Sequence, residues 1–322
     1  MTGPEPLPAP RAGREVYRDT IARLLGKDDR LVCLDSDTGL FTPVDWGADA
    51  DRYINLGIAE QNLMGAAAGL ARAGRIPYVN TMATFASTRA VEAVKLDIAL
   101  PGLPVRIAAT HSGLSAGHLG ATHHSLEDLA VMRLLPNMTV LAPADAAATE
   151  ELVRASVDLP GPVYLRLGRG ATPDLPADLP PLRIGEAQRL REGGDVTLIA
   201  TGPYPVLAAL EAADTLATEG VGAGVLNMHT VKPLDTEAVC AAAAATGHLV
   251  TVEEHWAVGG LGSAVAETVT GEGVPCRVSR IAVPDHFAAG HGGQRHLLLR
   301  NGITAEAIVE ASRNSPSRRQ FK

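Results

Sequence analysis

Short apolar runs alternate with amphipathic segments along most of the chain. The runs that are short enough for buried strands are 30–37, 76–80, 104–113, 137–143 and 162–169. The segments with helical periodicity are 14–25, 60–74, 87–100, 125–135 and 145–157. This alternation predicts a mostly parallel sheet with helices on both of its faces.

The same pattern starts again after a Pro-rich polar stretch, 171–184, which cannot continue a helix or a strand ladder. Strands are expected at 195–202, 221–228, 248–254 and 274–283, and helices at 205–220, 236–245, 258–269 and 303–314. The predicted fold class is therefore two doubly wound α/β domains. Their expected bounds are 13–170 and 185–322, with 171–184 as the linker. Residues 1–12 are expected to be disordered or draped over a neighbour.

Composition argues against nucleic-acid binding, secretion and membrane insertion. The 322 residues carry a net charge of −8 with only 28 Lys and Arg, so no basic stripe favours nucleic acid. No stretch has the pattern of a signal peptide or a membrane span. The cysteines Cys33, Cys240 and Cys276 lie far apart in sequence, which favours a reducing compartment. A soluble cytoplasmic protein is expected.

Glu60 stands at the head of a helix built mainly from Ala, Gly, Leu and Met. A glutamate in a first helical turn favours the positive end of the helix dipole, and that alone could explain it. However, a helix so rich in small apolar residues is usually packed on most sides, and a buried carboxylate without a partner costs several kcal/mol. Glu60 therefore needs a basic nitrogen or a proton.

Four histidines, His111, His118, His123 and His124, gather in a Gly-rich loop after an expected strand. Three interpretations compete. A metal site could use His123 with Glu127, or His124 with Asp128, but no third ligand has a recognised spacing. In a structural interpretation, residues 125–128 form a helix-capping box and His111 bonds a backbone carbonyl. Catalysis is favoured, because α/β sheets place their sites at the carboxyl ends of strands.

Arg169 and a group of glycines each allow a functional and a purely structural interpretation. Arg169 follows an expected strand, where it could clamp a phosphate or carboxylate or could be an ordinary surface arginine. Glycines 259, 260 and 262 precede an expected helix, but the spacing of a nucleotide-binding loop is incomplete. A tight turn into the helix is the simpler interpretation.

Four segments, in order, carry a family resemblance: YINLGIAEQNLMGAAAGLARAG (53–74), MATF with RAVEAVKLDIAL (82–85 and 89–100), ATHSGLSAGHLGATHHSLEDLAVMRLLPNMTVLAPAD (109–145) and GPVYLRLGRG (161–170). Together they resemble the C-terminal half of a transketolase, from Arg14 to the end of the chain. The resemblance implies thiamine diphosphate as cofactor. It implies that Glu60 bonds the aminopyrimidine ring and promotes deprotonation of the thiazolium carbon, that Phe85 stacks on that ring, and that Asp37 and Thr38 approach the cofactor.

The resemblance also assigns residues to a sugar substrate. His111 and His123 match the family's substrate-side histidines, and Arg14 and Arg169 match the pair that grips a sugar phosphate. Two positions depart from the family. Leu119, next to His118, stands where the family has an aspartate that hydrogen-bonds a sugar hydroxyl, and Phe41 stands near the position where the family has a phosphate-binding serine. A phosphorylated ligand other than an ordinary pentose or hexose phosphate is therefore expected.

The family binds the diphosphate and Mg²⁺ through a Gly-Asp-Gly motif in an N-terminal domain, and this sequence contains no such motif. The hypothesis is a split transketolase, in which an N-terminal subunit supplies that half within an α2β2 heterotetramer. Its activity would be transfer of a two-carbon ketol unit from a ketose to an aldehyde. The alternatives are the β subunit of a 2-oxo acid dehydrogenase, a non-catalytic assembly subunit that kept the fold and, formally, a metallohydrolase.

Overall fold

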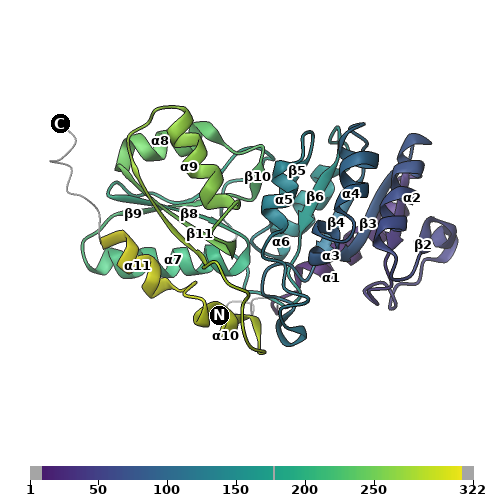
Figure 1. Ribbon diagram of the computed structural model, residues 1–322, viewed down its shortest axis with the longest axis horizontal. Helices are drawn as coiled ribbons and strands as arrows, with labels where there is room; N and C mark the ends of the chain where they lie inside the picture. The colour runs from purple at the N-terminus through teal and green to yellow at the C-terminus, as the bar shows by residue number, and fades with distance from the viewer. Residues whose placement is uncertain (1–8, 177, 314–322) are drawn as a thin grey trace, which may run out of the picture.

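The computed structural model describes residues 9–176 and 178–313. Figure 1 shows two α/β halves side by side, with the N-terminal half on the right. Each half is built around one sheet, of seven and of five strands. The prediction of two doubly wound α/β domains is confirmed.

The seven strands of the first sheet have the order β10-β5-β6-β4-β3-β1-β2. Those from the N-terminal half run parallel to one another, and they are β1 (Leu31–Asp35), β2 (Tyr53–Asn55), β3 (Ile76–Met82), β4 (Arg106–Thr110), β5 (Thr139–Leu141) and β6 (Val163–Arg166). The central strands are buried on both sides, which is why they have continuous apolar runs.

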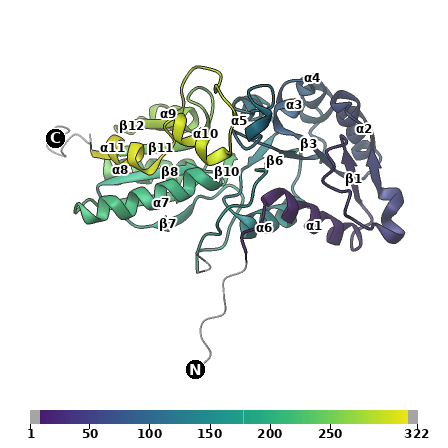
Figure 2. The same ribbon diagram turned by 90° about the horizontal axis from the view of Figure 1, so that it is seen from below.

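Helices cover both faces of this sheet (Figure 2). One face carries α1 (Gly13–Leu25) and α6 (Ala146–Ser156), which bury Tyr17, Ile21 and Leu152. The other face carries α2 (Glu60–Arg72), α3 (Ala83–Ser87), α4 (Val91–Ala93) with the π-helical turn η2 (Val94–Ala99), and α5 (Asp128–Leu134). Two 3₁₀ turns, η1 (Gly47–Arg52) and η3 (Gly117–Leu119), lie in loops.

The second sheet has the order β12-β11-β8-β9-β7. Its strands are β7 (Gln188–Arg191), β8 (Val196–Thr201), β9 (Ala223–Asn227), β11 (His248–Trp256) and β12 (Arg277–Val283). All pairs are parallel except that of β7 with β9. α7 (Pro203–Thr218), α10 (Gln294–Arg300) and α11 (Ala305–Arg313) share one apolar core, and α8 (Thr236–Thr246) and α9 (Leu261–Gly271) share another.

Several elements differ from the sequence-based expectation. The helix expected over 87–100 begins only at Val91 and is π-helical from Val94 (α4 and η2), and a turn separates it from the preceding helix α3. The helix expected from residue 125 begins at Asp128. Strands β2, β7 and β10 and helices α3 and α10 have no counterpart among the elements expected from the sequence. β10 (Thr230–Lys232) follows β9 in sequence, yet it pairs antiparallel with β5 in the first sheet. The two halves are therefore joined by a shared edge strand as well as by the chain between them.

Candidate active site

Glu60 is the first residue of α2, and its side chain is only 2% exposed. Arg89 Nη1 donates a hydrogen bond to Glu60 Oε2 over 2.9 Å, and no hydrogen bond to Oε1 occurs within 9–176 or 178–313. The carboxylate therefore has the basic partner that its burial requires. One of its oxygens remains available to a further donor.

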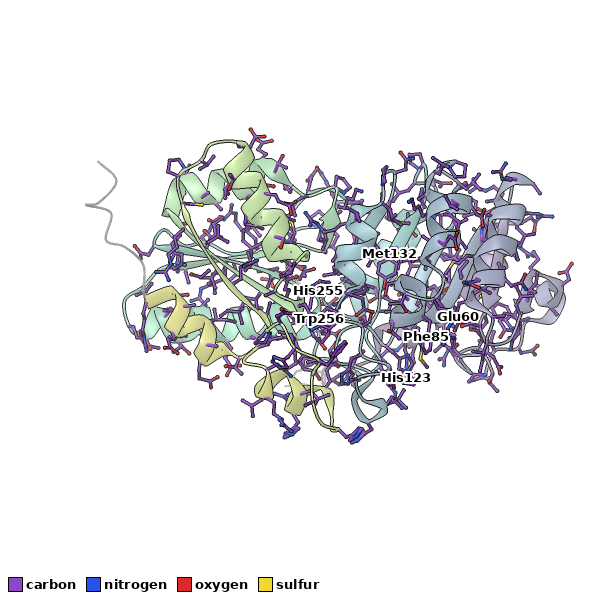
Figure 3. The ribbon with its side chains drawn as sticks, viewed as in Figure 1. Glu60, Phe85, His123, Met132, His255 and Trp256 are labelled. Carbon is purple, nitrogen blue, oxygen red and sulfur yellow. The ribbon has the colours of Figure 1, made fainter. Side chains whose placement is uncertain are left out.

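Phe85 and His123 continue from Glu60 along one side of the first domain, as Figure 3 shows. The Arg89 guanidinium lies 4.3 Å from the centre of the Phe85 ring, so Arg89 contacts both the ring and Glu60. The His123 ring meets Phe85 edge-on at 5.5 Å between centroids. The structure thus brings Glu60, Phe85 and His123 into one cluster, with Arg89 as a member that the sequence did not indicate.

His111 is buried directly after β4, with a left-handed φ of 58° that is unusual for a residue other than glycine. Its Nδ1 pairs with Thr110 Oγ1 at 3.0 Å. Burial and then the positive charges of Arg14 and Arg169 lower the pKa of His111 to about 4. The imidazole is therefore neutral near pH 7, and its surroundings attract negative charge.

Arg14 lies at the start of α1 and Arg169 lies in the segment after β6, close enough for their positive charges to repel each other. Burial and then the charge of Arg169 lower the pKa of Arg14. Both arginines line a groove of about 590 Å³ together with the exposed His118 of η3. Leu119, next in that turn, is 42% exposed. Four expected substrate residues, His111, His118, Arg14 and Arg169, thus belong to one electropositive region.

Asp37 and Thr38 follow the end of β1 in a separate polar network. Thr38 Oγ1 donates to Asp35 Oδ1 (2.8 Å), and Asn80 Nδ2 donates to both Asp35 Oδ1 and Thr38 Oγ1 (2.6 Å each). Asp37 is exposed and accepts a hydrogen bond from Asn55 Nδ2 over 3.0 Å. None of the hydrogen bonds between described residues joins Asp37 or Thr38 to Glu60 or Phe85.

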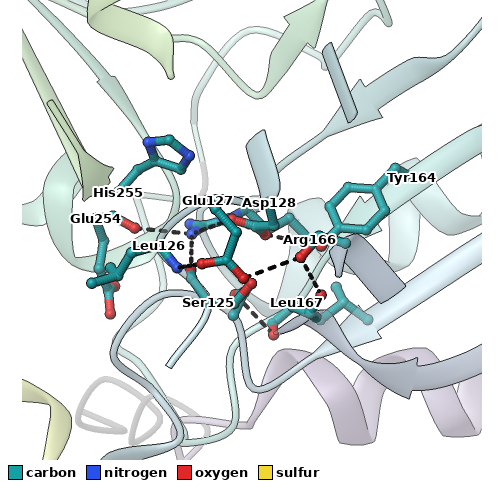
Figure 4. Close-up of polar contacts among 12 residues, drawn as sticks. Ser125, Leu126, Glu127, Asp128, Tyr164, Arg166, Leu167, Glu254 and His255 are labelled. Carbon is teal, nitrogen blue, oxygen red and sulfur yellow. Dashed lines mark hydrogen bonds and ion pairs between the residues drawn. The ribbon is translucent and has the colours of Figure 1, made fainter. Parts of the chain in front are cut away.

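A buried network behind the histidine loop links the two halves (Figure 4). Asp128 forms a bidentate ion pair with Arg166, at 2.8 Å and 3.0 Å, and accepts a hydrogen bond from Tyr164 OH at 2.9 Å. Arg166 also donates to the backbone oxygen of Glu254 at the end of β11, over 2.9 Å. The capping box suggested for 125–128 is wrong, because Asp128 turns inward to Arg166 and the buried Ser125 Oγ has no hydrogen-bond partner in the part of the chain that the structure describes.

The Glu254 side chain continues this link. Its buried carboxylate accepts a hydrogen bond from the N–H of Leu114 in the histidine loop (2.6 Å) and from Gln294 Nε2 on α10 (2.9 and 3.0 Å). Burial raises the pKa of Glu254 to about 7. At Gly113, φ is +59° and a Cβ would lie 2.7 Å from Glu254 Cδ, so this backbone passes directly against the carboxylate.

The structure also bears on four other features considered in the sequence: Phe41, the glycines before α9, a metal site and a membrane span. Phe41 is buried among Tyr17, Trp46 and Tyr53, where it serves the core. Glycines 259, 260 and 262 do lie at a tight turn into α9, whose Leu261 and Gly262 N–H groups are capped by the Glu253 carboxylate at 2.6 and 2.8 Å. Within 9–176 and 178–313, no group of three His, Cys, Asp or Glu residues could hold a metal, and no helix could cross a bilayer.

Sequence reasoning missed Arg89 and Glu254. Arg89 lies four residues after Phe85, a spacing that brings side chains together on a helix, but the break after α3 hides the pattern. Glu254 sits near the carboxyl end of a parallel strand, where α/β sites gather. That position in the strand is the signal that could have identified it.

Known proteins resemble this chain over nearly its whole length. Residues 9–174 match the family model "Transketolase, pyrimidine binding domain", and residues 185–308 match "Transketolase, C-terminal domain". The 6-deoxy-6-sulfo-D-fructose transketolase subunit SqwH of Clostridium sp. (strain MSTE9) is 41% identical over 96% of each chain. A subunit of the apulose-4-phosphate transketolase of Phocaeicola vulgatus is 39% identical over 94% of this chain and 96% of that one.

A solved structure described as "Split gene transketolase, inactive beta4 tetramer" is 41% identical, with a TM-score of 0.86 over 95% of this chain and 98% of that chain. The chain belongs to the transketolase family, whose members depend on thiamine diphosphate and act as transferases. Within that family it corresponds to the C-terminal subunit of a split transketolase. The comparisons do not favour the β subunit of a 2-oxo acid dehydrogenase.

Proposed function

We propose that this chain supplies the pyrimidine-binding and substrate-binding half of a two-chain transketolase that moves a two-carbon ketol unit from a phosphorylated ketose to an aldehyde. The observation that carries the proposal is the buried carboxylate of Glu60, whose arginine partner Arg89 also lies over the Phe85 ring. Its second oxygen accepts no hydrogen bond from residues 9–176 or 178–313. The proposed domain bounds remain 13–170 and 185–322, with 171–184 as linker.

The residues present fit the aminopyrimidine end of thiamine diphosphate. Glu60 offers a carboxylate oxygen to a ring nitrogen, and the half-buried Phe85 offers an aromatic face. Arg89 contacts both side chains, so a bound heterocycle would share Glu60 with Arg89 or displace it. When bound, the cofactor supplies the electron sink for cleavage of a carbon–carbon bond. Asp37 and Thr38 are proposed to lie beside the cofactor.

The neighbouring polar side chains are proposed to bind the substrate and to exchange protons with it. His111 is neutral near pH 7, because its pKa is lowered to about 4, so its imidazole can accept a proton or a hydrogen bond from a substrate hydroxyl. His123 is close enough for its charge to contribute to the lowered pKa of His111, and it packs against Phe85. Arg14, Arg169 and His118 are proposed to hold the charged end of the substrate.

A second subunit is part of the proposal. It would contribute the Mg²⁺ ion and the groups that hold the diphosphate, in an α2β2 assembly. The relatives named as transketolase subunits, and the β4 tetramer described as inactive, support a need for a partner. Cys33, Cys240 and Cys276 are free, which supports the cytoplasm as the compartment.

The substrate is proposed to be a sugar with an anionic end. The two relatives are named for a sulfonated sugar and for a sugar phosphate, which supports this class. The exposed Leu119 and His118 occupy the turn next to the charged groove, so they are proposed to set a substrate preference different from that for common pentose phosphates.

The test combines the purified chain with thiamine diphosphate, Mg²⁺ and candidate N-terminal subunits, and measures ketol transfer and decarboxylation separately. Glu60→Ala is expected to lower turnover at least about a hundredfold while the complex still assembles. The control is Gln61→Ala, the next residue, which is exposed. Turnover that survives Glu60→Ala would contradict the catalytic role. Tight cofactor binding by this chain alone would contradict the two-chain arrangement.

A further inference from the structure

The groove that contains Arg14 and Arg169 is formed by both domains. The first domain contributes these two arginines and the loop around His118, and the second contributes Tyr204 of α7 and the segment 292–296 at the start of α10. α10 lies at the junction of the two halves in Figure 2. Residues from the second domain therefore face the region assigned to the substrate.

The groove is unusually rich in uncompensated positive charge. Arg14, Arg169 and Arg295 form no ion pair with any described residue, and Glu15 is the only acid among the described residues that line the groove. His118 and His296 add two more nitrogen donors. Arg14 Nε is buried and has no hydrogen-bond partner among residues 9–176 and 178–313. An anion in the groove would give these groups the partners that they lack.

An aromatic ring, and no carboxylate among the described residues, orients the Arg295 side chain. Its guanidinium lies 6.0 Å from the centre of the Tyr204 ring. The preceding residue, Gln294, donates two hydrogen bonds to the buried Glu254, which also holds the histidine loop through Leu114 N–H. The backbone that carries Arg295 is thus fixed relative to the loop that carries His118.

The two segments also meet through their glycines. A Cβ on Gly117 would lie 2.8 Å from the backbone oxygen of Gly292, and Gly117 has a φ of +57°. A Cβ on Gly120 would lie 3.0 Å from His291. Side chains at these positions would separate the two walls, so the close approach depends on glycine.

We propose that Arg295 of the second domain is a specificity-determining residue that adds a third guanidinium to the subsite proposed above for the charged end of the substrate, and that this subsite therefore prefers a phosphate dianion to a monoanion. The phosphate dianion matches three guanidinium groups better than a monoanionic sulfonate does. This inference rests on the proposed function for the sugar portion of the substrate. It adds to that function a direct contact from the C-terminal domain.

Binding is tested first with the purified full chain alone, by calorimetric titration with inorganic phosphate and with methanesulfonate at low ionic strength. Phosphate is expected to bind more tightly, and Arg295→Gln is expected to raise its Kd about threefold to tenfold. Arg295→Lys should restore part of the affinity. The matched control is Arg189→Gln, which removes an exposed arginine of β7 outside the groove. Equal effects of Arg295→Gln and Arg189→Gln, or tighter binding of methanesulfonate, would overturn the proposal.

The active complex gives a second, independent measurement. Arg295→Gln is expected to raise KM for D-ribose 5-phosphate about threefold to tenfold with kcat unchanged, and to leave KM for unphosphorylated D-ribose unaffected. If the complex transfers ketol units and Arg295→Gln changes neither KM, the subsite fails while the proposed function stands. If no candidate complex is active but phosphate binding still depends on Arg295, the proposed function fails while the subsite stands.

Discussion

Removal of the Asp128 carboxylate is the sharpest test of the buried network between the two domains. Asp128 is fully buried, and Arg166 pairs with it at 2.8 and 3.0 Å. Burial alone would lower the pKa of Arg166, but the charge of Asp128 and its hydrogen bonds raise it, so the guanidinium stays ionised. Asp128→Ala would leave a buried cation without its counterion.

The expected cost is about 3 to 5 kcal/mol of unfolding free energy, the usual penalty for breaking a buried pair by removing one partner. Tyr164 OH also loses its acceptor, which adds to that cost. For a domain of this size a loss of about 4 kcal/mol corresponds to a fall in Tm of roughly 8 to 16 °C. Urea denaturation followed by circular dichroism measures the free energy, and thermal melting checks it.

The matched control is Glu150→Ala. Glu150 also accepts two hydrogen bonds from one arginine, Arg154, at 2.7 and 3.1 Å, and a third from Arg23 at 3.0 Å, but all three lie on the exposed side of α6. Solvent screens these contacts, so their loss is expected to cost less than about 1 kcal/mol. In the double variant Asp128→Leu with Arg166→Met, most of the lost stability should return, because neither position then leaves an unpaired charge. If Asp128→Ala cost no more than Glu150→Ala, the argument from burial would be refuted.

Two further predictions concern Glu254 and the backbone against it. Gly113→Ala is expected to lower the free energy of unfolding by more than about 2 kcal/mol, because a Cβ there meets Glu254 at 2.7 Å in addition to the strain of a positive φ. The control Gly247→Ala, at a φ of +67° with open space around it, should lower it by about 1 kcal/mol. Equal losses for the two variants in urea denaturation would contradict the contact with Glu254. Burial raises the pKa of Glu254 from its ordinary 4.5 to about 7, so between these values only the folded chain holds the proton, and the stability contribution of Glu254 falls as pH rises through that window. The free energy of unfolding of Glu254→Gln relative to wild type should therefore increase by about 3 kcal/mol from pH 4.5 to 7, and parallel curves for the two proteins would disprove the raised pKa.

The sequence by itself determined the class of fold and the chemical types at the candidate site. Periodicity separated strands from helices because buried parallel strands need continuous apolar runs, while helices need one apolar face. The small residues of α2 and the acid at its head predicted a buried Glu60 that requires a partner, and the structure contains that partner. These features follow from local patterns, so they can be found without coordinates.

Tertiary structure decided which residues meet. Arg89, the partner of Glu60, lies in the turn between α3 and α4, where the sequence suggested a continuous helix over 87–100. Asp128, the partner of Arg166, is the first residue of α5, which starts three residues later than the sequence suggested. Glu254 and Arg295 lie more than a hundred residues from the histidine loop, and their contribution depends on how the two sheets pack together. Hydrogen bonds and charges act over a few ångströms, and no pattern along the chain specifies which distant segments come that close.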